Sequence, residues 1–329
     1  MAEVFEITIT PHGKVFEAAA GETVLAGALG AGLNFPYGCN NGTCGLCAAR
    51  VVAGTVTQVV HQDFVFDGVR KRAGYALMCC SSAASDVAIE IGEARSARDL
   101  PHVQLMVKLM RVTTVAPEVL EVKLRCPRAT VMRYLSGQYV VLTLGDVSAS
   151  VPIASCPCEG GEISVHVDAK LRPRLAGALS AAPRAARVQI AGPEGEFCLH
   201  ESTTLECPAV LMIAEDIGIA SVQGLLGQLV NVDYAGPVRV FWHARAGMNR
   251  YAANACRALA DALDDGVFTF IEAPIDPSTA INAFGSGRDI AVYLAASADA
   301  IKVDIAGVRA LGVCAQRIFS SANDEGISV

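Results

Sequence analysis

The chain has 329 residues and a formal net charge of −7 at pH 7, with 52% hydrophobic and 18% charged residues. This length predicts two or three domains, the acidic balance disfavours nucleic-acid binding, which needs basic patches, and no apolar run approaches the ~20 residues that cross a bilayer. The first residues carry no basic segment followed by an apolar core, so we expect no secretory signal, a cytoplasmic location, and cysteines that serve as metal ligands and buried thiols rather than disulfides.

The first ninety residues predict a small mixed α+β unit. Alternating apolar and polar residues predict two hairpins, and a short helix with Thr23 as its N-cap lies between them. In chain order the expected elements are strands 3–9 and 14–18, helix 24–31, and strands 48–52 and 56–60.

Three cysteines lie between this helix and the second hairpin. Cys39, Cys44 and Cys47 have C-x4-C-x2-C spacing, which is the plant-type ligand pattern of a [2Fe–2S] cluster. One tight loop can present three thiolates to a compact cluster, while a fourth arrives from elsewhere in the fold. Structural zinc is disfavoured because a second C-x2-C pair or a Cys/His pair is missing.

Three glycines and one further cysteine complete the predicted site. Gly38, Gly42 and Gly45 stand where the loop must take unusual backbone angles and direct N–H groups at sulfur. The stretch resembles plant-type ferredoxins, in which an apolar residue and one other residue precede the fourth ligand. Leu77-Met78-Cys79 fits that pattern, so the resemblance implies Cys79 as the ligand and Cys80 as a bystander.

The remainder of the chain predicts two more domains. Short alternating strands predict an antiparallel barrel, and alternating strands and helices after Pro208 predict a doubly wound parallel sheet. We therefore expect α+β and α/β classes in one chain. The expected parts are a [2Fe–2S] ferredoxin domain over 1–93, a linker over 94–102, a flavin-type β-barrel over 103–206 and an NAD(P)-binding-type α/β domain over 207–329.

This order of domains resembles the reductase components of multicomponent oxygenases, such as the methane monooxygenase and benzoate dioxygenase reductases, in which a β-grasp ferredoxin is fused to a ferredoxin–NADP reductase module. The resemblance rests on scaffold motifs: Ser136-Gly137-Gln138-Tyr139, Ile153-Ala154-Ser155, Gly192-Pro193-Glu194-Gly195-Glu196-Phe197 and Arg317-Ile318-Phe319. It implies a hydride passed from NAD(P)H to FAD, then single electrons passed through the cluster to an oxygenase.

The motifs that bind FAD in that family are replaced here. The Arg-x-Tyr-Ser motif corresponds to Ala149-Ser150-Val151-Pro152, which lacks the charge, the aromatic platform and the hydroxyl. The glycine-rich phosphate turn corresponds to 170–175, where Lys170, Arg172 and Arg174 have no such glycine. For these three cations we expect a solvated basic turn.

The nucleotide motifs are replaced as well. In place of the family's Gly-Gly-Thr-Gly, the run 214–221 keeps only Gly218 and brings in two carboxylates, Glu215 and Asp216. Like charges about 4 Å apart repel by roughly 4 kcal/mol before screening. A fraction of that repulsion weakens diphosphate binding tenfold or more. The Cys-Gly-Pro of the family corresponds to Ala295-Ala296-Ser297, and Ser320-Ser321-Ala322-Asn323 replace an acidic and aromatic ending.

Two main hypotheses follow, and we assign no catalytic residue. In the first, the chain is a [2Fe–2S] electron carrier whose FAD and NAD(P)H sites are lost, and its partner is an oxygenase or a separate reductase. In the alternative, it is an active NAD(P)H-dependent FAD/[2Fe–2S] reductase component of an oxygenase, using residues that do not align. A third hypothesis makes the cluster a structural cross-link in a larger complex. The C-x-C pair Cys156 and Cys158 is expected to be idle thiols.

Overall fold

The computed structural model describes residues 3–10, 13–31, 33, 35–37, 39–43, 45–91, 100–127, 132–157, 162–199, 207–275, 277–282 and 289–323. The chain divides into two units, Met1–Pro101 and His102–Val329. Among the described residues, no helix is both long and apolar enough to cross a membrane.

The first unit is built on a five-stranded mixed sheet in the order β2-β1-β7-β3-β5, in which β1 and β7 run parallel. The Thr23 hydroxyl caps the helix by accepting from the Ala26 N–H at 3.2 Å, as expected. The elements are β1 (Val4–Thr10), β2 (Lys14–Ala19), α1 (Val24–Gly30), β3 (Ala48–Ala53), β4 (Val56–Gln58), α2 (Gly68–Arg72), β5 (Tyr75–Leu77), β6 (Ser81–Ala83) and β7 (Val87–Glu90).

The expected hairpin between residues 48–52 and 56–60 is wrong. Strand β3 pairs with β5 and β7, whereas β4 pairs with β6 in a separate two-stranded sheet. Gly54 turns the chain with a φ of +79° and lies against the backbone of Asp86, where a side chain would collide. The chain therefore leaves the main sheet at this glycine instead of folding back along β3.

The second unit begins with a six-stranded antiparallel sheet in the order β11-β10-β13-β8-β9-β12. The sheet curls until its edges meet at an isolated bridge between Ile153 and Val165. Strand β11 and helix α3 were not predicted from the sequence. The elements are β8 (Val103–Ala116), β9 (Val119–Arg125), β10 (Tyr139–Leu144), β11 (Val147–Pro152), β12 (Glu162–Asp168), α3 (Pro173–Ala181) and β13 (Arg187–Glu194).

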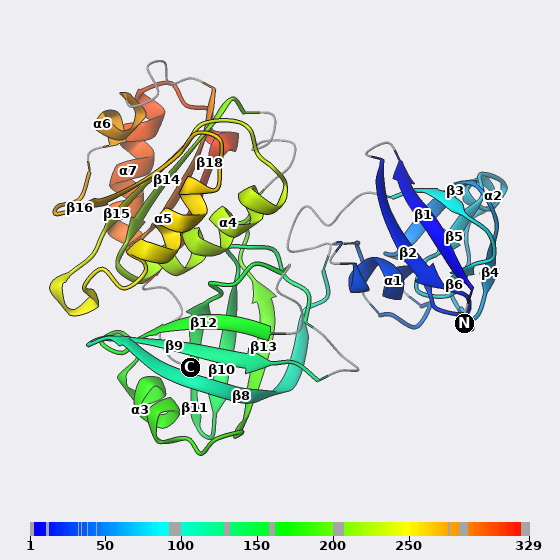
Figure 1. Ribbon diagram of the computed structural model, residues 1–329, viewed down its shortest axis with the longest axis horizontal. Helices are drawn as coiled ribbons and strands as arrows, with labels where there is room; N and C mark the ends of the chain where they lie inside the picture. Colours follow the sequence, from blue (N-terminus) through cyan, green and yellow to red (C-terminus); the bar gives the residue numbers. More distant parts are fainter. Residues whose placement is uncertain are drawn as a thin grey trace. The chain divides into compact units, whose positions relative to one another are not determined.

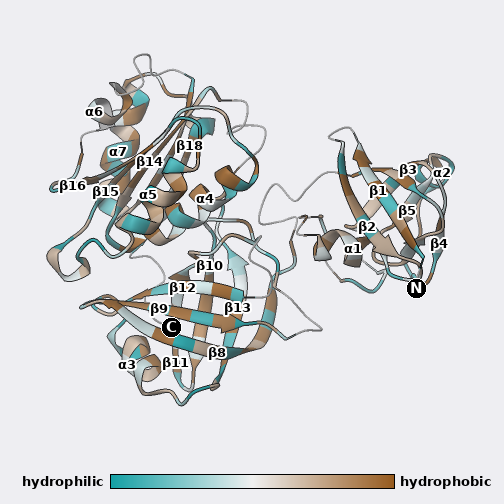
Figure 2. Cartoon of the chain, viewed as in Figure 1, coloured by the Kyte–Doolittle hydropathy of each residue, from teal (hydrophilic) through white to brown (hydrophobic). Residues whose placement is uncertain are grey.

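A five-stranded parallel sheet follows in the order β16-β15-β14-β17-β18. Helices α4 and α5 cover one face and α6 and α7 the other (Figure 1). Strand β14 is buried on both faces and is largely hydrophobic in colour (Figure 2), as central parallel strands are. The elements are β14 (Ala209–Glu215), α4 (Ile219–Asn231), β15 (Val238–His243), α5 (Ala253–Asp261), β16 (Gly266–Ile271), α6 (Pro277–Asn282), β17 (Ile290–Ala296), α7 (Ala298–Ala310) and β18 (Ile318–Ala322).

The predicted domain boundaries remain predictions. Residues 92–99, which contain most of the predicted linker 94–102, lie outside the described residues, and so do residues 200–206 before the predicted boundary at 207. Both sheets of the second unit belong to one compact unit.

Candidate functional site

The cysteine loop lies between α1 and β3 of the first unit. Of the predicted ligands, Cys39, Cys47 and Cys79 lie among the described residues, and Cys44 lies outside them, as does the predicted loop residue Gly38. Cys47 and Cys79 are buried, and Cys39 is half-buried.

Backbone N–H groups point at the sulfur atoms of this loop. The N–H groups of Asn41 and Thr43 donate to Cys39 Sγ at 3.5 and 3.3 Å, and the Cys79 N–H donates to Cys47 Sγ at 3.4 Å. Such donors stabilise negative charge on sulfur, and they tune the reduction potential of iron–sulfur clusters. The loop therefore has the hydrogen-bonding character that thiolate ligands need.

Cys47 and Cys79 form a close pair. The Cys47 thiol donates to Cys79, and this hydrogen bond, together with burial, raises the pKa of Cys47. Cys80 Sγ lies 3.6 Å from Cys79 Sγ, but it donates to the carbonyl oxygen of His61, which follows β4, at 3.7 Å. The geometry favours Cys79 over Cys80 as a partner of Cys47.

The two described glycines of the loop hold left-handed backbone angles. Gly42 has a φ of +82° and Gly45 a φ of +79°. A Cβ atom on Gly42 would lie 2.7 Å from Cys80 Sγ, and one on Gly45 would collide with the ring of Phe64. Both positions need glycine for conformation and for space.

Within the described part of the chain, no three Cys, His, Asp or Glu side chains gather around a single ion position. A [2Fe–2S] cluster distributes four cysteines over two irons, so it does not require such a group. The pair of Cys47 and Cys79 and the N–H donors to Cys39 fit a cluster of this kind.

The second unit has a pocket of about 510 Å³ where the two sheets meet. This volume lies within the range of ligand sites. The pocket contains one cation, Arg172, two carboxylates and a run of hydroxyl and amide side chains at the end of β18. The lining residues are Tyr139, Val141, Ser148, Ala149, Ser150, Val151, Pro152, Arg172, Glu194, Gly195, Glu196, Phe197, Ile217, Ser221, Ser320, Ser321, Ala322 and Asn323.

Arg172 departs from the expected solvated basic turn, whereas Lys170 and Arg174 are exposed as expected. The side chain of Arg172 is buried, and its guanidinium donates to the carbonyl oxygens of Ser150 at 2.5 Å and Asn323 at 3.0 Å. The arginine joins β11 to the residue that follows β18. Pro173 at the first position of α3 was the sequence signal for this helix, because proline favours that position.

Arg245, which follows β15, joins three carboxylates from both sheets. Its guanidinium contacts Asp168 and Glu118 at 2.7 Å and Asp216 at 2.8 Å. Burial alone would lower the pKa of this guanidinium, but the hydrogen bonds to Asp168, Glu118 and Asp216 raise it, so the group stays charged. Sequence reasoning missed this ion network because its members are up to 127 positions apart.

The end of β14, where the resemblance implies a glycine motif, is occupied by protein contacts. Asp216 has a φ of +50°, its carboxylate accepts from the Arg245 N–H at 2.8 Å, and its carbonyl accepts from Trp242 Nε1. Burial raises the pKa of the Glu215 carboxyl, and the Glu215 carbonyl accepts from Asn323 Nδ2 at 2.9 Å. The paired arginine offsets the Asp216 charge, so the simple repulsion estimate overstates the field there.

Gly218 has a packing role. A Cβ atom at this position would collide with the Ala295 carbonyl, so the glycine lets the turn after β14 lie against β17. Cys156, expected to be an idle thiol, is instead disulfide-bonded, and Cys158 lies outside the described residues.

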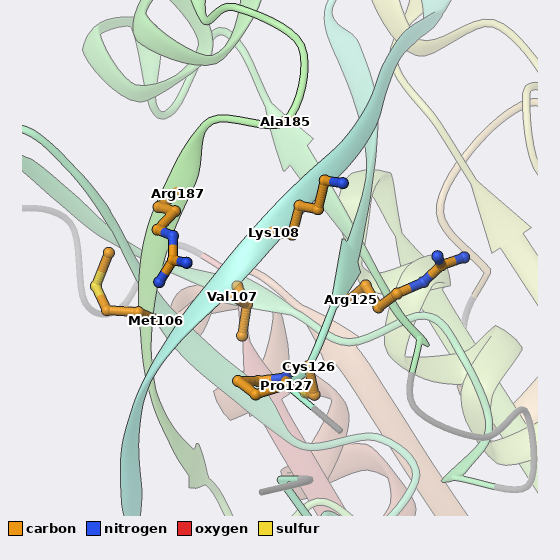
Figure 3. Close-up of a pocket in the computed structure, with 8 residues that line it drawn as sticks. All are labelled: Met106, Val107, Lys108, Arg125, Cys126, Pro127, Ala185 and Arg187. Carbon is orange, nitrogen blue, oxygen red and sulfur yellow. The ribbon is translucent and has the colours of Figure 1, made fainter. Parts of the chain in front are cut away.

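A second hollow, of about 390 Å³, lies on the antiparallel sheet and is lined by three cations (Figure 3). Arg187, Lys108 and Arg125 are in register across β13, β8 and β9. Arg125 forms an ion pair with Glu162. The hollow is a basic patch remote in sequence from the cysteine loop.

Comparison with known proteins identifies the first unit. Residues 7–84 match the family described as 2Fe-2S iron-sulfur cluster binding domain. The chain carries a 2Fe–2S domain. The match spans the whole cysteine loop and Cys79, and it confirms the ferredoxin part of the predicted fold.

Similarity extends over most of the chain. The chain is 27% identical over 250 residues to the CDP-6-deoxy-L-threo-D-glycero-4-hexulose-3-dehydrase reductase of Yersinia pseudotuberculosis serotype I (strain IP32953), and the match covers 75% of this chain and 73% of that protein. It is also 27% identical over 256 residues to the terephthalate 1,2-dioxygenase reductase component 1 of Comamonas sp, covering 76% and 73%. The crystal structure of the Amycolatopsis cytochrome P450 reductase GcoB matches with a TM-score of 0.60 and 19% identity over 97% of this chain and 98% of that one.

These matches confirm the predicted fold, a 2Fe–2S ferredoxin domain followed by a ferredoxin reductase-like module with an antiparallel and a parallel sheet. They confirm the resemblance to oxygenase reductase components and the expectation of an iron–sulfur electron-transfer protein. Because the relatives are named as reductases, they support the alternative hypothesis, an active reductase, better than an electron carrier with lost sites.

Proposed function

We propose that this chain is an electron-transfer component that holds a [2Fe–2S] cluster through Cys39, Cys44, Cys47 and Cys79 and passes single electrons to or from a redox partner protein, an oxygenase or a separate reductase. The observation that carries the proposal is the cysteine loop, in which N–H groups point at sulfur and Cys47 pairs with Cys79 inside a matched 2Fe–2S domain. The cluster, when bound, accepts and releases one electron at a time at low potential.

The residues of the loop prepare it for that task. The N–H groups of Asn41 and Thr43 hold negative charge at Cys39, on the more exposed side of the loop. The ring of Phe64 packs against Gly45 and supports the loop. A loop that is fixed by such contacts changes little in geometry between the oxidised and the reduced cluster, and a small change in geometry favours rapid electron transfer.

We further propose that NAD(P)H is not the electron donor. A dinucleotide diphosphate needs bare backbone N–H groups at the end of β14, but this chain places Asp216 and Glu215 there and joins Asp216 to Arg245. The residues present therefore do not fit a diphosphate, because binding one would require the ion network to break. The electrons would come from a separate reductase.

The pocket at Arg172 bears on FAD. Its volume suits a ligand, but Arg172 donates to backbone carbonyls, and the pocket's other charged residues are Glu194 and Glu196. These residues do not fit the phosphates of FAD in the manner of the family. Pro152, at the position of the family's hydroxyl, offers no N–H donor.

The similarity to named reductases favours a second candidate function, an NAD(P)H-dependent FAD/[2Fe–2S] reductase. The ratio of flavin to iron in the purified protein separates the two. The electron-carrier proposal expects iron without flavin, no ferricyanide reduction with NADH or NADPH, and reversible bleaching by dithionite. Stoichiometric FAD and NADH-dependent ferricyanide reduction would establish the reductase instead, and a cluster that cannot be reduced reversibly would leave only a structural role.

A further inference from the structure

Large apolar side chains are exposed beside the cysteine loop of the first unit. Val65 is 85% exposed and Val69 is 70% exposed, and Leu46, inside the loop, is also exposed. Single exposed apolar residues are ordinary, but a group of them at a functional site marks an interaction surface. We define the α2 surface as Val65, Val69, Arg70, Lys71 and Arg72.

Aromatic side chains attach this surface to the cluster loop. The Phe64 N–H donates to the Gly42 carbonyl at 2.9 Å, and the Phe64 ring covers Gly45. Phe64 packs edge-on against Phe66, with ring centroids 5.1 Å apart. The ring centroids of Phe66 and Tyr75 are 6.4 Å apart. Val65, which directly follows Phe64, therefore lies close to the loop, and Phe66 joins the same segment to Tyr75 of β5.

The α2 surface concentrates positive charge. The described part of the first unit contains five cations, Lys14, Arg50, Arg70, Lys71 and Arg72, and the last three are consecutive in α2. The guanidinium of Arg70 lies 5.8 Å from the centre of the Tyr75 ring.

Two acids in the same segment have local partners. Asp67 accepts from the N–H groups of Val69 and Arg70 as the cap of α2. Asp63 pairs with His61 at 3.1 Å. Neither carboxylate forms an ion pair with the α2 cations, so the exposed end of α2 presents net positive charge.

We propose that the α2 surface docks a redox partner protein that presents acidic side chains around an apolar centre. The proposal rests on the proposed function, since it names the partner's chemistry for the same cluster. Charge complementarity selects an acidic partner and speeds its approach, and Val65 and Val69 supply the apolar contact.

Other occupants fit less well. A second copy of this chain would bring the two basic helices together in an isologous contact. A membrane surface gains only about 1 kcal/mol per cation, and the five-residue α2 is too short to bury the apolar face of an interfacial helix. Vesicle binding and self-association are therefore outcomes that would overturn the proposal.

The experiment measures reoxidation of the full-length, dithionite-reduced protein by stopped flow without oxygen. The acceptors are an oxidised acidic blue-copper protein, an oxidised basic cytochrome c and a neutral quinone. With the copper protein, one electron leaves the reduced protein and Cu(II) becomes Cu(I), and no bond or proton changes place.

Each test variant has a matched control. Lys71→Glu is compared with Lys14→Glu on β2 and with Lys108→Glu in the other basic patch (Figure 3). Val65→Ser is compared with Val52→Ser, an exposed valine on β3.

We expect Lys71→Glu to slow oxidation by the acidic acceptor about fivefold or more at low ionic strength, with the difference shrinking as salt rises. Val65→Ser should slow it without changing the salt dependence, and the neutral quinone should react alike with all variants. The proposal is overturned if Lys71→Glu and either control have equal effects, or if the wild type reacts faster with the basic acceptor. It is also overturned if the protein binds vesicles of anionic lipid, or a second copy of itself, and Lys71→Glu abolishes that binding. Failure of every acceptor, the quinone included, would instead overturn the proposed electron-transfer function.

Discussion

Replacing Arg245 by methionine tests whether its ion network holds the two sheets of the second unit together. Asp168 is fully buried, and its Oδ2 has no hydrogen-bond partner among the described residues, so the arginine is its only counter-charge there. Removing one partner of a buried ion pair costs about 3–5 kcal/mol. Glu118 and Asp216 are each about one third exposed, and the loss at each is at most about 1 kcal/mol.

The expected loss is therefore about 3–7 kcal/mol, a large share of the ~5–15 kcal/mol by which domains are stable. Urea unfolding measures it, with the fluorescence of Trp242 as the reporter. This is the single tryptophan of the chain, it is fully buried, and it donates to the Asp216 carbonyl beside Arg245.

Two further variants make the result interpretable. Arg174→Met removes an exposed pair with Asp146 and should cost no more than about 1 kcal/mol. Adding Asp168→Asn to Arg245→Met should recover part of the loss, because the uncompensated buried charge is then gone. If Arg245→Met unfolds at the same urea concentration as Arg174→Met, the network does not join the sheets and the reasoning is refuted.

Three other predictions concern the cluster, the nucleotide groove and pH. Cys79→Ser should remove the visible absorbance and the bound iron while Cys80→Ser keeps both, and the reverse pattern would reassign the fourth ligand. Glu215→Gly should not create NADH-dependent ferricyanide reduction, because Asp216 and Arg245 still fill the groove; an NADH-active variant would show an intact flavin site. Burial lowers the pKa of His166 from 6.5 to about 4, so the unfolded chain binds a proton that the folded chain excludes, and stability should fall by about 3 kcal/mol as pH drops from 6.5 to 4. Unfolding curves of the wild type and His166→Gln between these pH values check this, and equal pH slopes would contradict it.

The cysteine loop and most regular elements were predictable from the sequence. The spacing of Cys39, Cys44 and Cys47 is local and can be read directly as the plant-type ligand pattern. Thr23 capped its helix as predicted because a cap acts within four residues. The parallel sheet after Pro208 was predictable because the hydrophobic pattern of each strand and helix lies within one short segment, and strands that alternate with helices are typical of a parallel sheet.

Contacts between segments far apart in the chain could not be predicted from the sequence. Strand β4 resembles a hairpin partner of β3, yet Gly54 takes the chain out of the sheet and β4 pairs with β6. Arg172 resembles a solvated cation, but folding places Asn323, 151 positions away, against it.

The end of β14 shows the same division. From the sequence it was already evident that two carboxylates, Glu215 and Asp216, follow the apolar run of β14. The tertiary structure decided that one of them, Asp216, shares Arg245 with Glu118 and Asp168. Charge is a property of a residue and can be read along the chain, whereas its compensation depends on which distant groups the fold brings within a few ångströms.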